Sequence, residues 1–136
     1  MSLFLMDSDI LINHLRRVKP LDAYTGEPLP THRYGCSTIV VAEVYVGMRP
    51  EEEPATRQLL ESLIHFAVTS EVAERAAELK RRYQKKGATL TLADCLIAAT
   101  CLIENATLVT LNAKDYPMLD RIVNRPIAGS SSSSSL

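Results

Sequence analysis

The chain has 136 residues, of which 46% are hydrophobic and 23% charged, and its formal net charge at pH 7 is −1. This length and composition fit a single globular domain with a substantial core. The near-neutral charge excludes a uniformly basic nucleic-acid-binding protein, so a polyanion would need a local basic patch or a metal ion.

The serine-rich end of the chain, the length of its apolar runs and the spacing of its cysteines limit the classes of protein that fit. We expect one domain over residues 1–128, followed by a flexible serine-rich tail over residues 129–136. No apolar run reaches the roughly 20 residues that cross a bilayer, and no signal peptide is recognisable, which predicts a cytoplasmic protein with no membrane association. The 3 cysteines lack a Cys-x-x-Cys spacing, so we expect buried, reduced thiols rather than disulfides or a zinc site.

The N-terminal part of the chain predicts a strand, a helix and a loop. Residues 3–6 are apolar and predict a buried strand, and Asp7 and Asp9 after it are residue types that begin helices. Residues 19–35 contain 3 prolines and no clear period, which predicts a loop with at most one turn of helix. Within this loop, residues 32–34 are either a contact surface or simply solvated. The helix between these segments has an apolar stripe of Ile10, Leu11, His14, Leu15 and Val18.

The middle of the chain combines a β-branched run with an amphipathic pattern. Residues 36–41 favour a strand but also fit the start of a helix, and we expect a short strand that runs into a helix carrying Glu43. Residues 49–66 predict one amphipathic helix, and residues 66–68 predict a brief strand. The apolar stripe of that helix is Leu59, Leu60, Leu63 and Ile64.

The C-terminal half has the clearest helix signals. Residues 71–86 lie between a Thr-Ser pair and a glycine, with acids in the first turn and basic residues in the last turns, and predict a helix. A second helix is predicted over residues 92–102, capped by Thr91. Residues 107–111 predict a short strand, and residues 122–123 predict a last one.

Three acids and one amide stand alone among apolar residues. Strands that alternate with helices predict an α/β fold with a parallel sheet between helices on both faces, and polar residues then meet outside the carboxyl ends of the strands. Converging carboxylates repel one another unless a hard divalent ion binds them, which predicts a magnesium or manganese site that activates water for phosphodiester hydrolysis. The alternative is that these side chains are helix caps or core ion pairs, and Thr91 and Asp94 have the spacing of a capping box. The four residues are Asp7 after the first strand, Glu43 and Asp94 in otherwise uncharged helical segments, and Asn112 after the strand at residues 107–111.

Four segments in this order resemble a known family. They read Leu-Met-Asp7-Ser-Asp-Ile-Leu-Ile, Ser37-Thr-Ile-Val-Val-Ala-Glu43-Val-Tyr-Val-Gly47, Leu-Ala-Asp94-Cys-Leu-Ile-Ala-Ala-Thr and Leu-Val-Thr110-Leu-Asn112-Ala-Lys-Asp115-Tyr. Together they resemble the PIN domain, in particular VapC-type toxins of toxin–antitoxin pairs, over essentially the whole chain before the serine tail. The resemblance implies an α/β/α sandwich and a magnesium-dependent endoribonuclease that cuts RNA, is usually a homodimer, and is inhibited by a cognate antitoxin protein.

The resemblance also implies roles for particular residues. Asp7, Glu43 and Asp94 match the three acidic positions of the family. Asp7 and Asp94 would hold the first metal ion, and Glu43 would bind or orient the attacking water or a second metal ion. Asn112 stands where the family often has Asp and frequently Asn, and it would complete the shell together with Asp115. Manganese is expected to substitute for magnesium.

Side chains outside this set leave more than one interpretation open. Asp9 stands where the family commonly has Asn or Ser, and it either binds metal through water or only caps the helix. The basic run at residues 80–86, together with Arg16, Arg17 and Lys114, is a candidate set of phosphate contacts. The same basic run also complements a helix dipole and solvates a helix face.

Two other functions fit part of the pattern. Haloacid-dehalogenase-type phosphatases also open with an apolar strand and Asp-x-Asp, as at Asp7 and Asp9, and use the first Asp as a nucleophile. They also carry a later Gly-Asp motif and a cap, which this sequence lacks. A non-catalytic module that keeps the PIN fold and binds RNA or protein is compatible with Asn112, although a binder has no need of three costly buried acids.

Overall fold

The computed structural model describes residues 2–26 and 32–123, which fold around a sheet of five strands. The strands lie in the order β3-β2-β1-β4-β5, and every neighbouring pair is parallel. The serine-rich tail and the last residues of the predicted domain lie outside the described residues. The strands are β1 (Ser2–Met6), β2 (His32–Ser37), β3 (Ile64–Phe66), β4 (Thr107–Val109) and β5 (Ile122–Val123).

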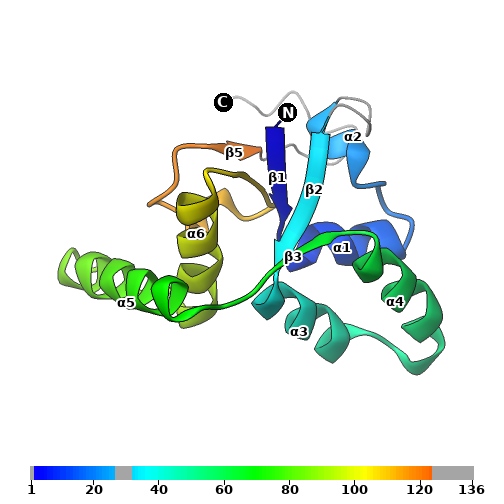
Figure 1. Cartoon of the computed structure of the whole chain (residues 1–136), viewed down its shortest axis with the longest axis horizontal. Helices are drawn as coiled ribbons and strands as arrows, with labels where there is room; N and C mark the ends of the chain where they lie inside the picture. The colour runs from blue at the N-terminus through cyan, green and yellow to red at the C-terminus, as the bar shows by residue number, and fades with distance from the viewer. Residues whose placement is uncertain (1, 27–31, 124–136) are drawn as a thin grey trace.

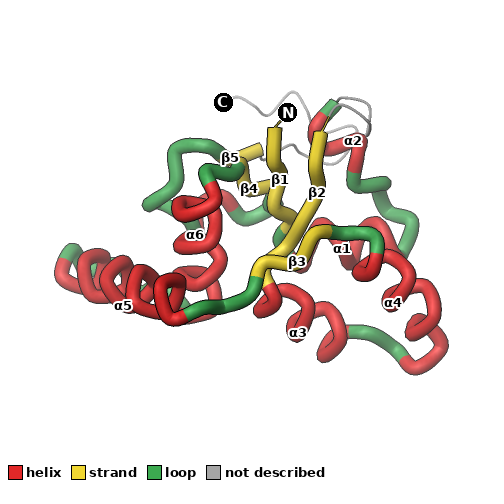
Figure 2. Tube along the Cα trace, viewed as in Figure 1, coloured by secondary structure: helices red, strands yellow, loops and turns green. Residues whose placement is uncertain are grey.

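Helices flank the sheet on both sides (Figure 1, Figure 2). Helices α1, α3 and α4 contact one another on one side, and α5 packs on α6 on the other, which confirms the predicted α/β/α sandwich. No helix in the described part of the chain has the length and hydropathy of a membrane span. The helices are α1 (Ser8–Leu15), α2 (Asp22–Thr25), α3 (Thr38–Gly47), α4 (Glu53–Glu61), α5 (Ser70–Lys85) and α6 (Leu92–Glu104), with short 3-10 segments η2 (Pro50–Glu52) and η3 (Ala113–Asp115).

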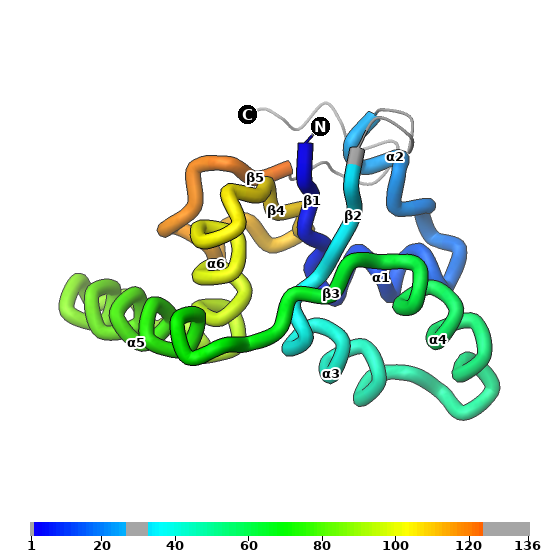
Figure 3. Tube along the Cα trace, viewed as in Figure 1, coloured from blue at the N-terminus to red at the C-terminus, as the bar shows by residue number. Residues whose placement is uncertain are grey.

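Strand β1 lies in the middle of the sheet, where the order of the strands reverses. From β1 the chain moves outward through β2 to β3 and then returns to the other side of β1 as β4 (Figure 3). Where neighbouring strands connect toward opposite faces, α/β proteins bind ligands at the carboxyl ends of those strands. We call this edge of the sheet the crevice. Met6 pairs with Val109, so Asp7 and Thr110, the residues that directly follow the two strands, lie side by side at this crevice.

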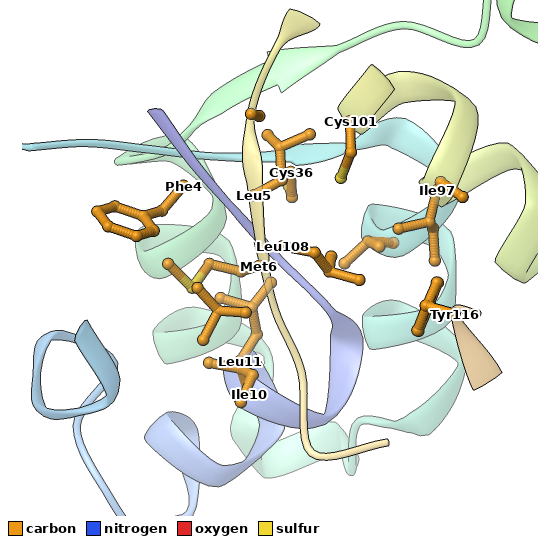
Figure 4. Packing of buried hydrophobic residues seen from close by; sticks show 14 of the residues in the cluster. Phe4, Leu5, Met6, Ile10, Leu11, Cys36, Ile97, Cys101, Leu108 and Tyr116 are labelled. Carbon is orange, nitrogen blue, oxygen red and sulfur yellow. The ribbon is translucent and has the colours of Figure 1, made fainter. Parts of the chain in front are cut away.

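The core packs on both faces of β1, because side chains alternate between the two faces of a strand. Figure 4 shows Phe4 and Met6 on the side of Leu11 of α1, with Ile97 and Cys101 of α6 on the other side. All five side chains are at most 8% exposed. The cysteines are also free and buried, as expected.

Gly35 lets β2 and β3 approach each other closely. A Cβ atom at this position would lie 2.7 Å from the carbonyl oxygen of Ile64 and 2.8 Å from Cε2 of Phe66. These distances are well below van der Waals contact, so a side chain at position 35 would push β3 away from the sheet.

The structure corrects the predicted end of the first helix. Helix α1 ends at Leu15, and Val18, which was expected in its apolar stripe, is 52% exposed. Arg17 adopts a φ of 59°, in the left-handed region that a helix cannot continue through. Val18 has the spacing of the apolar stripe, but the helix has ended before it is reached.

The second strand begins earlier than predicted. Strand β2 starts at His32, inside the segment expected to be a loop, because pairing with β1 continues back to Ser2. Tyr34 is therefore buried, and its hydroxyl lies 2.9 Å from the hydroxyl of Thr25. Burial of Tyr34 contradicts both alternatives for residues 32–34, a contact surface and a solvated loop.

The helix predicted over residues 49–66 is shorter in the structure. It is divided into η2 and α4 and ends at Glu61, and Ile64 belongs to β3. The brief strand predicted at residues 66–68 is also displaced, because β3 pairs in register with residues 35–37 of β2. Helices α5 and α6 and strand β5 agree with the prediction to within two residues.

Candidate active site

The three predicted acids reach the crevice from three different elements. Asp7 follows β1 and is the N-cap of α1, where its Oδ1 accepts a hydrogen bond from the Ser8 backbone N–H at 2.8 Å. Glu43 lies in the middle of α3, and Asp94 lies in the first turn of α6. The Thr91 hydroxyl accepts from the Asp94 backbone N–H at 3.0 Å, so Asp94 is part of a helix cap as well as facing the crevice.

Asp7 is the hub of the hydrogen-bond network at the crevice. It is 7% exposed, and its backbone N–H donates to the Val109 carbonyl at 3.0 Å, which extends the pairing of β1 with β4. Its Oδ2 accepts from the Thr110 hydroxyl at 2.8 Å and from the Tyr116 hydroxyl at 3.0 Å. Several donors therefore hold this carboxylate in one orientation.

Tyr116 joins two of the acids, and sequence reasoning missed it. The side chain is 1% exposed, and its hydroxyl lies 3.0 Å from Asp7 Oδ2 and 3.1 Å from Asp94 Oδ1. Burial, followed by the charges of both carboxylates, raises the pKa of Tyr116 far above its usual range, so the phenol is neutral and donates. Tyr116 follows Asp115 in the last of the four segments that resemble the family. An aromatic residue after an acid does not indicate a hydrogen bond to two carboxylates elsewhere in the chain.

Burial and the charges of neighbouring carboxylates raise the pKa values of Glu43 and Asp94. For Glu43 the causes are burial and then the charge of Asp7, with a smaller effect from Asp94, while a hydrogen bond from the Ser8 side chain opposes the rise. For Asp94 burial is again the largest cause, opposed by hydrogen bonds from Thr91 and Tyr116. The carboxylates are thus close enough to sense one another and disfavour being charged together.

Asn112 is hydrogen-bonded to Asp9, whereas Asp115 lies near Asp94. The Asn112 side-chain amide donates to Asp9 Oδ2 at 2.9 Å, and the Leu111 backbone N–H donates to the same oxygen at 3.2 Å. Asp9 therefore ties the segment after β4 to the start of α1, and its contact with Asn112 was not foreseen. Asp115 lies at the end of η3, where its charge contributes to the raised pKa of Asp94.

The donor set at the crevice suits a divalent cation, although it is not already assembled as a metal cluster. In the part of the chain that the structure describes, no three Asp, Glu, His or Cys side chains converge closely enough to form a metal-binding group. The Tyr116 hydroxyl instead stands between Asp7 and Asp94. Glu43 Oε1 and Asp9 Oδ1 are nevertheless buried without a hydrogen-bond partner among the described residues. Oxygen ligands of this kind, with repelling charges, fit Mg²⁺ or Mn²⁺.

Two of the basic residues proposed as phosphate contacts have partners within the protein. Arg16 forms an ion pair with Glu52 at 3.2 Å and also donates to the Gly47 carbonyl. Lys80 is only partly exposed, and its Nζ donates to the Leu90 carbonyl. The remaining basic candidates are exposed and stay a prediction; they are Arg17, Arg81, Arg82, Lys85, Lys86 and Lys114.

Comparison with known protein sequences gives matches over most of the chain. The family model of the PIN domain matches residues 4–121. Ribonuclease VapC10 of Mycobacterium tuberculosis is 33% identical over 120 residues, covering 88% of this chain and 90% of the relative. Ribonuclease VapC19 of the same organism is 29% identical over 115 residues, covering 84% and 92%.

Similar solved structures include a toxin–antitoxin complex. A toxin–antitoxin complex from Klebsiella pneumoniae has a chain that is 28% identical, with a TM-score of 0.72 and coverage of 91% of this chain and 97% of that chain. VapBC2 from Rickettsia felis, bound to a DNA fragment from its promoter, has a chain with a TM-score of 0.74 and 22% identity, covering 91% and 98%. The second likeness concerns the fold alone.

Proposed function

The chain belongs to the PIN-domain family, and from this we propose that it is a magnesium-dependent endoribonuclease of the VapC toxin type. The observation that carries the proposal is the meeting of Asp7, Glu43 and Asp94 at the reversal point of the sheet, where the charge of Asp7 contributes to the raised pKa values of Glu43 and Asp94. The similarity to two proteins named as ribonucleases supports RNA as the substrate. Membership of this family removes the haloacid-dehalogenase alternative.

Asp7, Asp94 and Glu43 are the residues that would hold the metal ion, with Mn²⁺ as a substitute for Mg²⁺. When bound, a divalent cation polarises a water molecule and stabilises the negative charge that develops on a phosphodiester. Asp7 keeps one lone pair of Oδ1 free beside its bond from Ser8, and Asp94 keeps its second carboxylate oxygen away from Tyr116. Both carboxylates therefore retain oxygens that can face a cation.

Glu43 is suited to orient the attacking water and accept its proton. Its raised pKa brings it closer to the pH at which proton transfer takes place, and its buried Oε1 lacks a protein partner within the described residues. Asp115 adds negative charge beside Asp94, and Asn112 is held by Asp9 at the rim of the crevice. We assign both to the outer part of the site.

The proposal includes a protein partner. The similar structure from Klebsiella pneumoniae is a toxin–antitoxin complex, which supports a cognate antitoxin that binds and inhibits this chain. A homodimer is part of the same proposal, because the family resemblance implies it. RNA would contact exposed basic side chains mainly through its phosphates, since phosphate contacts dominate the affinity of such complexes.

An RNA cleavage assay tests the proposal. Purified protein is incubated with a mixed tRNA and mRNA pool in Mg²⁺, Mn²⁺ or EDTA, and wild type is compared with Asp94→Asn and with Asp120→Asn, an exposed acid as the matched control. We expect metal-dependent cleavage that falls by at least about 100-fold in Asp94→Asn and is unchanged in Asp120→Asn.

Two results would contradict this assignment. Cleavage by Asp94→Asn at the wild-type rate would remove Asp94 from the site. Folded wild type that cuts no RNA under either ion would favour the non-catalytic module. Co-purification with a small antitoxin would then indicate instead a toxin whose substrate is absent from the pool.

A further inference from the structure

We infer that Tyr116 is a positioning residue of the metal site, whose hydroxyl holds one oxygen of Asp7 and one of Asp94 so that their other oxygens face the cation. This inference rests on the proposed function. It adds to that function a residue that carries no charge and matches none of the acidic positions of the family resemblance.

The first step is the count of lone pairs on the two carboxylates. Asp7 Oδ2 accepts from Thr110 at 2.8 Å and from Tyr116 at 3.0 Å, which uses both of its lone pairs. Oδ1 accepts only the Ser8 N–H in the described structure and keeps one lone pair. Asp7 can therefore offer Oδ1 to a cation without breaking a hydrogen bond. On Asp94 the Tyr116 contact occupies one lone pair of Oδ1, and the Thr91 side chain is a second hydrogen-bond partner of this carboxylate, so lone pairs remain for a cation.

The second step is the number of hydrogens. A neutral phenol has one hydroxyl hydrogen to donate, yet Tyr116 Oη lies at almost equal distances, 3.0 Å and 3.1 Å, from oxygens of two different carboxylates. One donor shared by two acids compensates their repulsion only in part, so the pair has an unmet demand for positive charge. A cation bound on the remaining oxygens meets that demand while the hydroxyl keeps the two carboxylates apart.

The third step is the rigidity of Tyr116 itself. Its ring belongs to the hydrophobic core and is 1% exposed, and Figure 4 shows it on the α6 side of the sheet. The Tyr116 backbone N–H donates to the Ala113 carbonyl at 3.0 Å, and its own carbonyl accepts from Leu119 at 3.1 Å. A side chain fixed at both backbone and ring presents its hydroxyl at a set point, which is what orienting a metal ligand requires.

The test compares Tyr116→Phe with wild type, using Mg²⁺ alone as the probe. Phe keeps the buried ring and removes only the hydroxyl. Tyr34→Phe is the matched control, because Tyr34 is also buried and also loses one hydroxyl hydrogen bond, to Thr25, away from the acids. Isothermal titration calorimetry on the full chain measures the Kd for Mg²⁺, and circular dichroism monitors folding.

We expect Tyr116→Phe to bind Mg²⁺ about 10- to 100-fold more weakly than wild type, with Tyr34→Phe unchanged. The Mg²⁺ concentration for half-maximal RNA cleavage should rise by the same factor. If wild type binds Mg²⁺ and Tyr116→Phe binds it equally well or more tightly, the positioning role is overturned and the proposed function stands. If wild type binds no Mg²⁺ at all, the metal site of the proposed function fails, and this inference fails with it.

A second measurement covers the case in which Tyr116→Phe does not fold. Wild type labelled with 3-fluorotyrosine is titrated with Mg²⁺ and observed by fluorine NMR. The chain has 5 tyrosines, and single Tyr→Phe variants at the other four positions identify their resonances and leave that of Tyr116. The Tyr116 resonance should shift with the calorimetric Kd while that of Tyr34 stays in place. A Tyr116 resonance that does not respond at saturating Mg²⁺ would overturn the inference.

Discussion

Replacing Asp9 by Asn should stabilise the protein at neutral pH and leave its stability unchanged in acid. Burial, and then the charge of Asp7, raises the pKa of Asp9 from its ordinary 3.8 to about 6, and Oδ1 is buried without a partner in the described residues. Asn has the same shape, and its oxygen can still accept from Leu111 and Asn112 as Asp9 Oδ2 does. The substitution therefore removes a repelled charge and keeps both hydrogen bonds.

The size of the effect follows from the shift in pKa. A rise from 3.8 to about 6 corresponds to about 3 kcal/mol of destabilisation of the folded state when Asp9 is charged, at about 1.36 kcal/mol per pH unit. Asp9 is partly exposed, so solvent screening reduces this value to about 1–2 kcal/mol. Because the folded state holds the proton more tightly than the unfolded state, this penalty is fully present above pH 6 and disappears as the pH falls from 6 to 3.8.

Urea unfolding with EDTA, at pH 7.5 and at pH 4, measures the free energy of unfolding of wild type and Asp9→Asn. The variant should be more stable by about 1–2 kcal/mol at pH 7.5 and equal to wild type near pH 4. Asp22→Asn serves as a control with an acid outside the crevice. Equal stabilisation at both pH values, or destabilisation at pH 7.5, would refute the explanation by repulsion and burial.

Two further predictions concern the site. Thr110→Val should lower the free energy of unfolding by about 1–3 kcal/mol, because a buried carboxylate loses a donor and the Asn112 N–H loses its acceptor. Thr100→Val removes a hydroxyl that donates to the Leu96 carbonyl and should cost clearly less in the same urea titration. Equal losses would contradict the role of Asp7. Mg²⁺ at ten times its Kd should stabilise the wild type by about 1.4 kcal/mol and raise its melting temperature. This shift, measured by calorimetry, should vanish in Asp7→Asn, and its persistence would place the ion elsewhere.

Local interactions made several elements predictable. Thr69 and Thr91 cap α5 and α6 with their own hydroxyls, and the glycine that ends α5 has a φ of 87°. Each of these signals depends on residues within one turn, so it can be read from neighbouring positions alone. The short strands were less predictable: β2 and β3 begin where partner strands reach them, and the polar start of β2 has no apolar alternation to mark it.

The sequence by itself identified the acids that lie together at the crevice, and the tertiary structure decided how they are held. A single charge in an apolar run is unusual because burying it unpaired is costly. This cost indicates that Asp7, Glu43 and Asp94 have a role other than solvation. The hydroxyls of Thr110 and Tyr116 gave no such signal, because Thr and Tyr are common in ordinary cores. They reach Asp7 from 103 and 109 positions away in the chain, and only the pairing of β4 with β1 brings them there, so the contact exists in the fold and not in any local pattern.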